Sequence, residues 1–303
     1  MATRYLRFKS RSSAEPQRVP LLEKLLARAG ASTLRDDWRA DAFLALEPGG
    51  PMPGLAAAAY LTTRESGAAG IDCRWRGLAT PVHYLAEMSN VRLAAAGILQ
   101  LQAEEAALLA RDFARTWDDR EFRLEAVGAL LFCSCRSTLL ANQSDPEQAL
   151  GRHIQDFLPT GQDAAALKRL MSEMEMWLFD HAVNVQRRAG ALQTVSALWL
   201  WGGAAPLDSL PPTSAGAAGE DVFFNAFAAA KGRPENVMVV QDEPGAGTWN
   251  AAPARWLQAA LEDLRRGVIT RLDLSSGAWR FEVTRRWRSR IFRKAKPWWE
   301  YFD

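Results

Sequence analysis

The amino-acid sequence predicts an α/β protein that has a mixed sheet with flanking helices, preceded by a smaller α+β amino-terminal region. Its 303 residues suit two domains of ordinary size or one large α/β domain. Helical and strand-like patterns alternate after residue 160, which favours a sheet that is at least partly parallel. The near-continuous apolar run at 194–201 is typical of a strand buried on both faces. We therefore expect an α+β region over residues 1–160 and an α/β region over residues 161–303.

The amino-terminal region contains helical and strand-like segments in mixed order. Leucines share one helical face within 19–29, and Gly30 follows as a carboxy-terminal cap. Short apolar runs separated by Gly, Asp and Asn suit strands of an antiparallel or mixed sheet. The expected elements are a helix at 19–29, strands at Leu55–Leu61, Pro81–Leu85 and Val91–Leu101, a helix at 103–117, and strands at Phe122–Val127 and Leu130–Cys135.

The carboxy-terminal region opens with the clearest helix of the chain, expected at 163–189. Asp163 suits its amino-terminal cap and Gly190 its carboxy-terminal end, and an apolar stripe runs along one face between them. The elements expected after it are a strand at 194–201, a loop at 202–221, a helix at 222–231, a strand at 236–241, a helix at 251–266, and strands at 268–274 and 278–283.

Composition restricts the class of protein. A formal net charge of +2 argues against a dedicated polyanion binder, whose basic excess is larger. The chain has no apolar run of membrane-spanning length, and its basic start is not followed by the apolar stretch of a secretory signal. Three cysteines cannot all pair with one another, which favours a reducing compartment. We therefore expect a cytoplasmic protein.

A pattern of residues between Glu173 and Pro206 points to a family. It consists of a helix that ends in Asn-x-x-Arg, then a glycine, then a strand that contains Trp-x-Trp-Gly-Gly. The residues that carry it are Asn184, Arg187, Gly190, Ser196, Trp199, Trp201, Gly202 and Gly203.

This pattern resembles the RpfE-like family of bacterial regulatory proteins, which is often described as related to cofactor-independent phosphoglycerate mutase. The chain departs from the family pattern at Ser196–Ala197, where Asn-Ser is usual, and at Ala204, which replaces a third glycine. The resemblance implies an alkaline-phosphatase-like or phosphomutase-like scaffold, in degenerate form. It implies little about chemistry, because the family is poorly defined in function.

Asn184 and Arg187 are the candidate anion site. Their spacing places them on one side of a helix, together with Asp180, His181 and Arg188. A guanidinium group binds phosphate through two parallel hydrogen bonds, and the amide of Asn184 would orient the ligand. The alternative is a solvated helix face on which Asp180 and Asn184 pair with the arginines.

Two further features are ligand-binding candidates. Gly202 and Gly203 could expose backbone N–H groups to a phosphate at the end of a strand, or they could form a tight exit from a buried strand. Trp199 and Trp201 point to the same side of the sheet. They would form a stacking platform for a ligand or pack beneath a helix.

Metal and cofactor chemistry has little support. A two-metal phosphomutase needs clustered Asp and His ligands, whereas His83, His153 and His181 are far apart in the sequence. We expect no catalytic residue, no metal and no cofactor. Cys133 and Cys135 are expected to be small buried apolar residues, since no further ligands at suitable spacing accompany them.

The carboxy-terminal tail is basic and aromatic. It is a candidate contact for an anionic surface, the alternative being a terminal element that packs its aromatic rings and leaves its arginines in water. The arginines concerned are Arg285, Arg286, Arg288, Arg290 and Arg293.

Two functions remain open from the sequence. The first is a non-catalytic regulatory or interaction protein on a phosphoglycerate-mutase-like scaffold. The second is a phosphotransferase or mutase that acts on a small phosphorylated metabolite. The expected partner is accordingly an unidentified protein or a small phosphorylated ligand.

Overall fold

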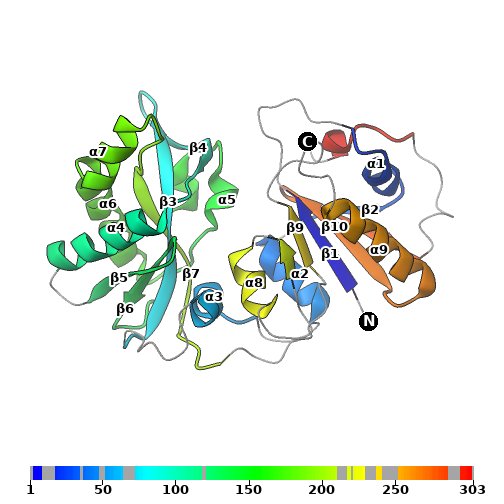
Figure 1. The fold of residues 1–303 in the computed structure, drawn as a ribbon, viewed down its shortest axis with the longest axis horizontal. Coiled ribbons are helices and arrows are strands. Elements are labelled where there is room, and N and C mark those ends of the chain that lie inside the picture. Colours follow the sequence, from blue (N-terminus) through cyan, green and yellow to red (C-terminus); the bar gives the residue numbers. More distant parts are fainter. Residues whose placement is uncertain are drawn as a thin grey trace. The chain divides into compact units, whose positions relative to one another are not determined.

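The computed structural model describes residues 3–8, 18–34, 37–47, 52–63, 72–117, 121–209, 217–219, 221–228, 237–240, 252–285 and 294–301. The chain forms two compact units (Figure 1). Unit 1 consists of Met1–Met52 together with Pro211–Asp303, and unit 2 consists of Pro53–Leu210. This division differs from the predicted one, because position 160 lies inside unit 2. The reason is that both ends of the chain contribute strands to the sheet of unit 1.

Unit 1 contains a mixed sheet, as predicted. Its central strand β1 (Thr3–Phe8) is parallel to two strands from the carboxy-terminal part of the chain. The strand order is β2 (Gly30–Thr33), β11 (Trp279–Thr284), β10 (Arg271–Ser276), β1, β9 (Val237–Val240) and β8 (Ala217–Gly219). The pairs β10–β11 and β11–β2 are antiparallel, and β8–β9 is parallel.

The two faces of this sheet differ in polarity. Alternate residues such as Leu6, Leu272 and Phe281 form an apolar core with α1 (Pro20–Leu26), α9 (Ala252–Arg266) and η3 (Trp298–Tyr301). The helices α2 (Trp38–Leu46) and α8 (Val222–Ala228) lie on the other side of the sheet (Figure 1). They pack against each other through Phe43 and Phe223, whose ring centroids are 5.9 Å apart.

Unit 2 contains an antiparallel sheet. The central strand β3 (Trp75–Ala86) pairs with β4 (Val91–Ile98), with β6 (Leu130–Cys135) and with β7 (Ala197–Ala204). β6 also pairs with β5 (Phe122–Val127). The helices of unit 2 are α3 (Leu55–Thr63), α4 (Ala103–Thr116), α5 (Pro146–Ala149), η1 (Ile154–Phe157), α6 (Ala164–Phe179) and α7 (Ala182–Ala189).

The predicted burial of the apolar strand is confirmed. Leu198 and Leu200 are fully buried in β7, and α6 packs against this strand. Among the described residues β7 is hydrogen-bonded to β3 alone, so it is buried on both faces without lying between two strands. β7 pairs in an antiparallel sheet, so it does not belong to the parallel part of the fold. Among the described residues the parallel strand pairs are β1–β10, β1–β9 and β8–β9, which lie in unit 1.

Three expectations about local structure were wrong. The run Leu55–Leu61 belongs to helix α3 rather than to a strand, because its four consecutive alanines favour a helix. The helix expected at 163–189 is interrupted at Asp180–His181. The expected loop at 202–221 begins with strand residues, since β7 continues to Ala204 past a β-bulge opposite Arg76–Leu78.

Most other elements lie near their predicted positions. These are α1, α4, β5, β6, α8, β9, α9, β10 and β11. No helix in the described part of the chain is long and apolar enough to cross a lipid bilayer.

Candidate functional site

Asn184 is buried and fully engaged within unit 2. Its amide nitrogen donates to the carbonyl oxygens of Leu178 (2.7 Å) and Val195 (2.8 Å). Its side-chain oxygen accepts from the backbone N–H of Val195 at 2.7 Å. These bonds join the end of α6, the helix α7 and the segment before β7. The side chain therefore holds these three parts of the chain together by hydrogen bonds.

Arg187 is buried one turn further along α7. Its Nε donates to the carbonyl oxygen of Gln193 at 2.6 Å, and its Nη1 lies 2.9 Å from Oε1 and 3.0 Å from Oε2 of Glu105. Glu105 in turn accepts from the backbone N–H of Gln102 at the start of α4. The arginine thus ties α7 to α4. Since both Asn184 and Arg187 are buried, the alternative of a solvated helix face does not apply to them.

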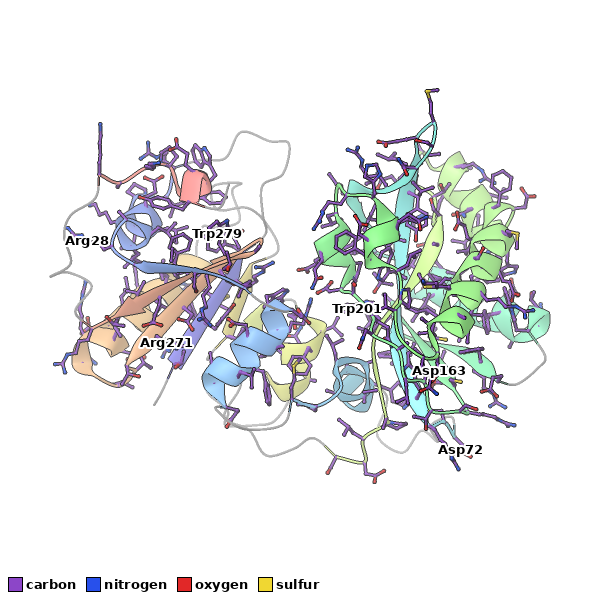
Figure 2. All side chains as sticks on the ribbon, turned by 180° about the vertical axis from the view of Figure 1, so that it is seen from behind. Arg28, Asp72, Asp163, Trp201, Arg271 and Trp279 are labelled. Carbon is purple, nitrogen blue, oxygen red and sulfur yellow. The ribbon has the colours of Figure 1, made fainter. Side chains whose placement is uncertain are left out.

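The two tryptophans of the family pattern are also buried and hydrogen-bonded. The Nε1 of Trp199 donates to the carbonyl oxygen of Ser144 at 2.8 Å. The Nε1 of Trp201, which is labelled in Figure 2, donates to Oγ1 of Thr80 at 2.7 Å. Neither ring is exposed enough to stack on a ligand from solvent. This geometry favours packing over a stacking platform.

Gly202 and Gly203 lie inside β7 and not in the predicted turn. A side chain at Gly203 would put its Cβ 2.1 Å from Cζ2 of Trp75, and Gly202 has a φ of +64° at the β-bulge. The backbone N–H of Gly203 donates to Oε1 of Gln143 at 2.9 Å. Close packing and the bulge explain these glycines, and the N–H group that a phosphate would need is already bonded.

The structure does not bring all the predicted residues to one place. Asn184 and Arg187 are tied to Val195 and Gln193, which precede β7, whereas Gly202 and Gly203 stand near its far end. The predicted anionic-surface contact of the basic tail falls mostly outside the described residues, which do not include Arg286, Arg288, Arg290 and Arg293. Arg285 is exposed at the end of β11.

The histidines have separate environments. His83 Nδ1 lies 2.9 Å from the carbonyl oxygen of Thr194, and His153 pairs with Arg92 in a β-bridge. His181 is the amino-terminal cap of α7, where its Nδ1 accepts from the N–H of Val183. Burial lowers the pKa of His181, although Asp112 at 3.5 Å opposes this shift. Within the described ranges no group of three or more His, Cys, Asp or Glu could hold a metal ion.

Unit 1 contains a polar cluster that the sequence patterns did not predict, on the sheet face opposite the apolar core. We call it the polar face and define it by Tyr5, Arg7, Asp273, Ser275 and Arg280. Tyr5 and Arg7 come from β1, Asp273 and Ser275 from β10, and Arg280 from β11. Arg271 and Trp279, labelled in Figure 2, mark the two ends of the β10–β11 hairpin.

Helix α2 contributes a carboxylate to the polar face. Arg280 Nη1 lies 2.6 Å from Oδ1 of Asp41, and the hydroxyl of Tyr5 donates to Oδ2 of Asp41 at 3.3 Å. Arg7 donates to the carbonyl oxygen of Gly277 and lies over the ring of Trp38. α2 is therefore attached to the sheet by charged and aromatic contacts.

Asp273 is the most strongly perturbed acid of this cluster. Its Oδ2 accepts from Nη2 of Arg271 at 2.7 Å, but burial raises the pKa of the carboxyl to about 6, against the opposing effect of Arg271. A period-two pattern of polar residues in Thr3–Arg7 and in Arg271–Ser275 was the available sequence signal. This pattern is typical of an ordinary strand with one face exposed to solvent, and the sequence does not show that a helix covers the polar side.

A short part of the chain is similar in sequence to a phosphoglycerate mutase. No model of a known protein family matches it. A 2,3-bisphosphoglycerate-independent phosphoglycerate mutase from Methanothrix thermoacetophila is 36% identical over 66 residues, which are 22% of this chain and 17% of that protein. The match thus spans a small fraction of the curated relative's length.

Two solved structures align with most of the chain at low TM-scores. The cofactor-independent phosphoglycerate mutase from Thermoplasma acidophilum is 12% identical, with a TM-score of 0.37 over 93% of this chain and 89% of that one. The PH0037 protein from Pyrococcus horikoshii is 11% identical, with a TM-score of 0.36 over 93% and 87%. The mixed α/β class stated above depends on the strand pairing of this chain itself.

Proposed function

We propose that this protein is a non-catalytic regulatory or interaction protein on a scaffold related to the phosphoglycerate mutases. The family resemblance and the short similarity to a mutase support the relationship. The observation that carries the proposal is the internal use of the family-pattern side chains. Asn184 and Arg187 direct their polar atoms at Leu178, Val195, Gln193 and Glu105, all within unit 2.

A substrate could not take these partners over without cost. If a phosphate displaced Glu105 from Arg187, the carboxylate, whose side chain is only 16% exposed, would lose its ion pair. Breaking a buried pair in this way costs several kcal/mol. The pattern is therefore better suited to holding helices and strands together than to binding and releasing a metabolite.

An interconversion assay of 3-phosphoglycerate and 2-phosphoglycerate, with Mn²⁺ and with Mg²⁺, tests the proposal. We expect no turnover above that of the buffer, while an authentic mutase in the same assay is active. Turnover that scales with the protein and survives further purification would overturn the non-catalytic role. The folded state of the sample is checked by its cooperative thermal unfolding.

The second candidate function is a phosphotransferase or mutase acting on a small phosphorylated metabolite. Its one support is that Arg7, Arg280 and the neighbouring Arg271 come together on one side of a sheet in unit 1, and guanidinium groups bind phosphate strongly. Asp41, Asp273 and Glu282 offset these charges, which makes this the weaker candidate. Turnover in the assay above that is lost in Arg280→Lys would support this candidate.

The expected setting is part of the same proposal. Cys73, Cys133 and Cys135 are free thiols, which suits a reducing compartment such as the cytoplasm. A protein partner, or a small phosphorylated ligand that modulates its binding, is the interaction that this role requires.

A further inference from the structure

We propose that the polar face of unit 1 binds a small zwitterion of the amino-acid class through Asp273, Ser275 and Arg280. This inference extends the proposed function by giving the regulatory protein a ligand. The site lies in unit 1 and uses none of the family-pattern residues, so the two proposals can fail separately.

The strand register places these three side chains close together. Ser275 on β10 is the direct cross-strand neighbour of Arg280 on β11, and Asp273 precedes Ser275 by two residues on the same face. Cross-strand neighbours have Cβ atoms about 5 Å apart, and residues two apart in a strand are separated by roughly 7 Å. A ligand of a few non-hydrogen atoms spans such a group.

Each of the three side chains has a buried polar atom that no hydrogen bond of normal geometry reaches, although the hydroxyl of Tyr5 lies close to that of Ser275. These atoms are Oδ1 of Asp273, Oγ of Ser275 and Nε of Arg280. Asp273 and Ser275 are both 0% exposed. An unsatisfied buried polar group costs about 1–3 kcal/mol, so three neighbouring ones indicate an absent partner.

The chemistry of these atoms specifies the ligand. The carboxylate oxygen of Asp273 requires a donor, and an ammonium group is the strongest one available. The Nε of Arg280 and the hydroxyl of Ser275 can both donate to a carboxylate. An amino acid carries one group of each kind at short separation.

Charge balance favours a zwitterion over an anion. Among the described residues on this face and its rim, Arg7, Arg271 and Arg280 are matched by three acids, namely Asp41, Asp273 and Glu282. The neighbouring Arg39 pairs with two acids, Asp221 and Asp37, so the surroundings of this face carry no excess positive charge that would call for an anion. A phosphate or a simple carboxylate would add net charge to a buried site, which is costly, whereas a zwitterion adds none.

Helix α2 covers this site. Asp41 is held by Arg280 and Tyr5, so a ligand reaches the polar face only when α2 opens locally from the sheet. We therefore expect association to be slower than diffusion and the bound state to unfold at a higher temperature.

Thermal unfolding and calorimetric titration of the full chain test the inference. The probes are glycine and L-serine at millimolar concentration, with acetate and methylammonium as controls that carry one charged group each. We expect saturable binding and a raised Tm with glycine and L-serine, and neither effect with acetate or methylammonium. An absent response to glycine and L-serine, or an equal response to acetate, would overturn the proposal.

The two adjacent serines of β10 provide a matched pair of variants. Ser276 is also 0% exposed and its hydroxyl also lacks a partner, but alternation along the strand puts it on the opposite face. Ser275→Ala should weaken zwitterion binding about tenfold, the equivalent of one hydrogen bond of ~1.4 kcal/mol. Ser276→Ala should leave it unchanged, and equal weakening in both variants would contradict the site.

Asp273→Asn should weaken binding further, because an amide replaces the charged partner of the ammonium group. If Asp273→Asn does not fold, Arg280→Lys is measured instead, because lysine keeps the charge but lacks the Nε–H donor. Unaltered binding in the folded variant would contradict the site. Mutase turnover would contradict only the non-catalytic role, and absent zwitterion binding would contradict only the site on the polar face. Both results together would contradict both proposals.

Discussion

Arg187 on α7 and Glu105 on α4 form a buried ion pair, with Nη1 of the arginine 2.9 Å from Oε1 of the glutamate. The two residues are 82 positions apart in the chain. Arg187 belongs to the family pattern, whereas Glu105 lies on helix α4, which the pattern does not include. The pair explains an arginine at this position without any ligand.

The first prediction follows from this pair. Arg187→Ala should lower the free energy of unfolding by about 2–4 kcal/mol, since it leaves the carboxylate of Glu105 without its partner. Urea unfolding measures the loss. Arg169→Ala is the control, because Arg169 pairs with Glu173 but is 82% exposed, and water screens such a pair so that its loss changes stability little.

Ligand titration separates the two interpretations of Arg187. If the residue is structural, tryptophan fluorescence of wild type will not respond to millimolar phosphate or 3-phosphoglycerate. Arg187→Lys will then change the Tm only. A saturable response of wild type that is weakened in Arg187→Lys would show an anion site instead.

The second prediction concerns the close contact between Gly203 and Trp75. Gly203→Ala should destabilise unit 2 by about 2–3 kcal/mol or more, because the added methyl group overlaps a fully buried indole ring. Gly190→Ala is a suitable control, since its nearest neighbour would be 3.6 Å away. Equal stability of the two variants would contradict the packing described.

The third prediction is a pH dependence from His181. Its pKa is lowered in the folded state, so the unfolded chain binds more protons below the ordinary value of 6.5. Stability from this group is therefore complete above that value and is lost as pH falls through the folded pKa. His181→Asn keeps a capping side chain but does not titrate, and the difference between the two proteins should grow on acidification.

The fourth prediction has the opposite sign and concerns Asp273. Its pKa is raised to about 6 from 3.8, so the folded state binds more protons between these values and stability is lost as pH rises through them. Relative to wild type, Asp273→Asn should gain about 2–3 kcal/mol between pH 4 and pH 7, at ~1.4 kcal/mol per pKa unit. Chemical unfolding at a series of pH values checks this, and a pH-independent difference would contradict the raised pKa.

The fifth prediction is that the purified protein contains no stoichiometric divalent metal. It follows from the wide separation of His83, His153 and His181 in sequence and from their separate environments. Elemental analysis of the full chain is the measurement. Two Mn or Zn ions per chain, retained on gel filtration, would show that residues outside the described ranges complete a metal site.

The sequence by itself determined the local structure of most elements. The apolar stripe of α4 and the short apolar runs of β5 and β6 predicted these elements to within one residue, because such patterns are properties of adjacent residues. The burial of Leu198 and Leu200 could also be predicted, since a strand with no polar side can lie only in an interior.

Only the tertiary structure decided which distant segments meet. β1 pairs with β10 across more than 260 residues, and nothing local in Thr3–Phe8 identifies its partner or its register. The same holds for Arg187, whose charge is compatible with a ligand, with water or with Glu105 until the position of α4 is known. The polar face arises in the same way, because Asp273, Ser275 and Arg280 become a cluster only when α2 covers the sheet and removes their water.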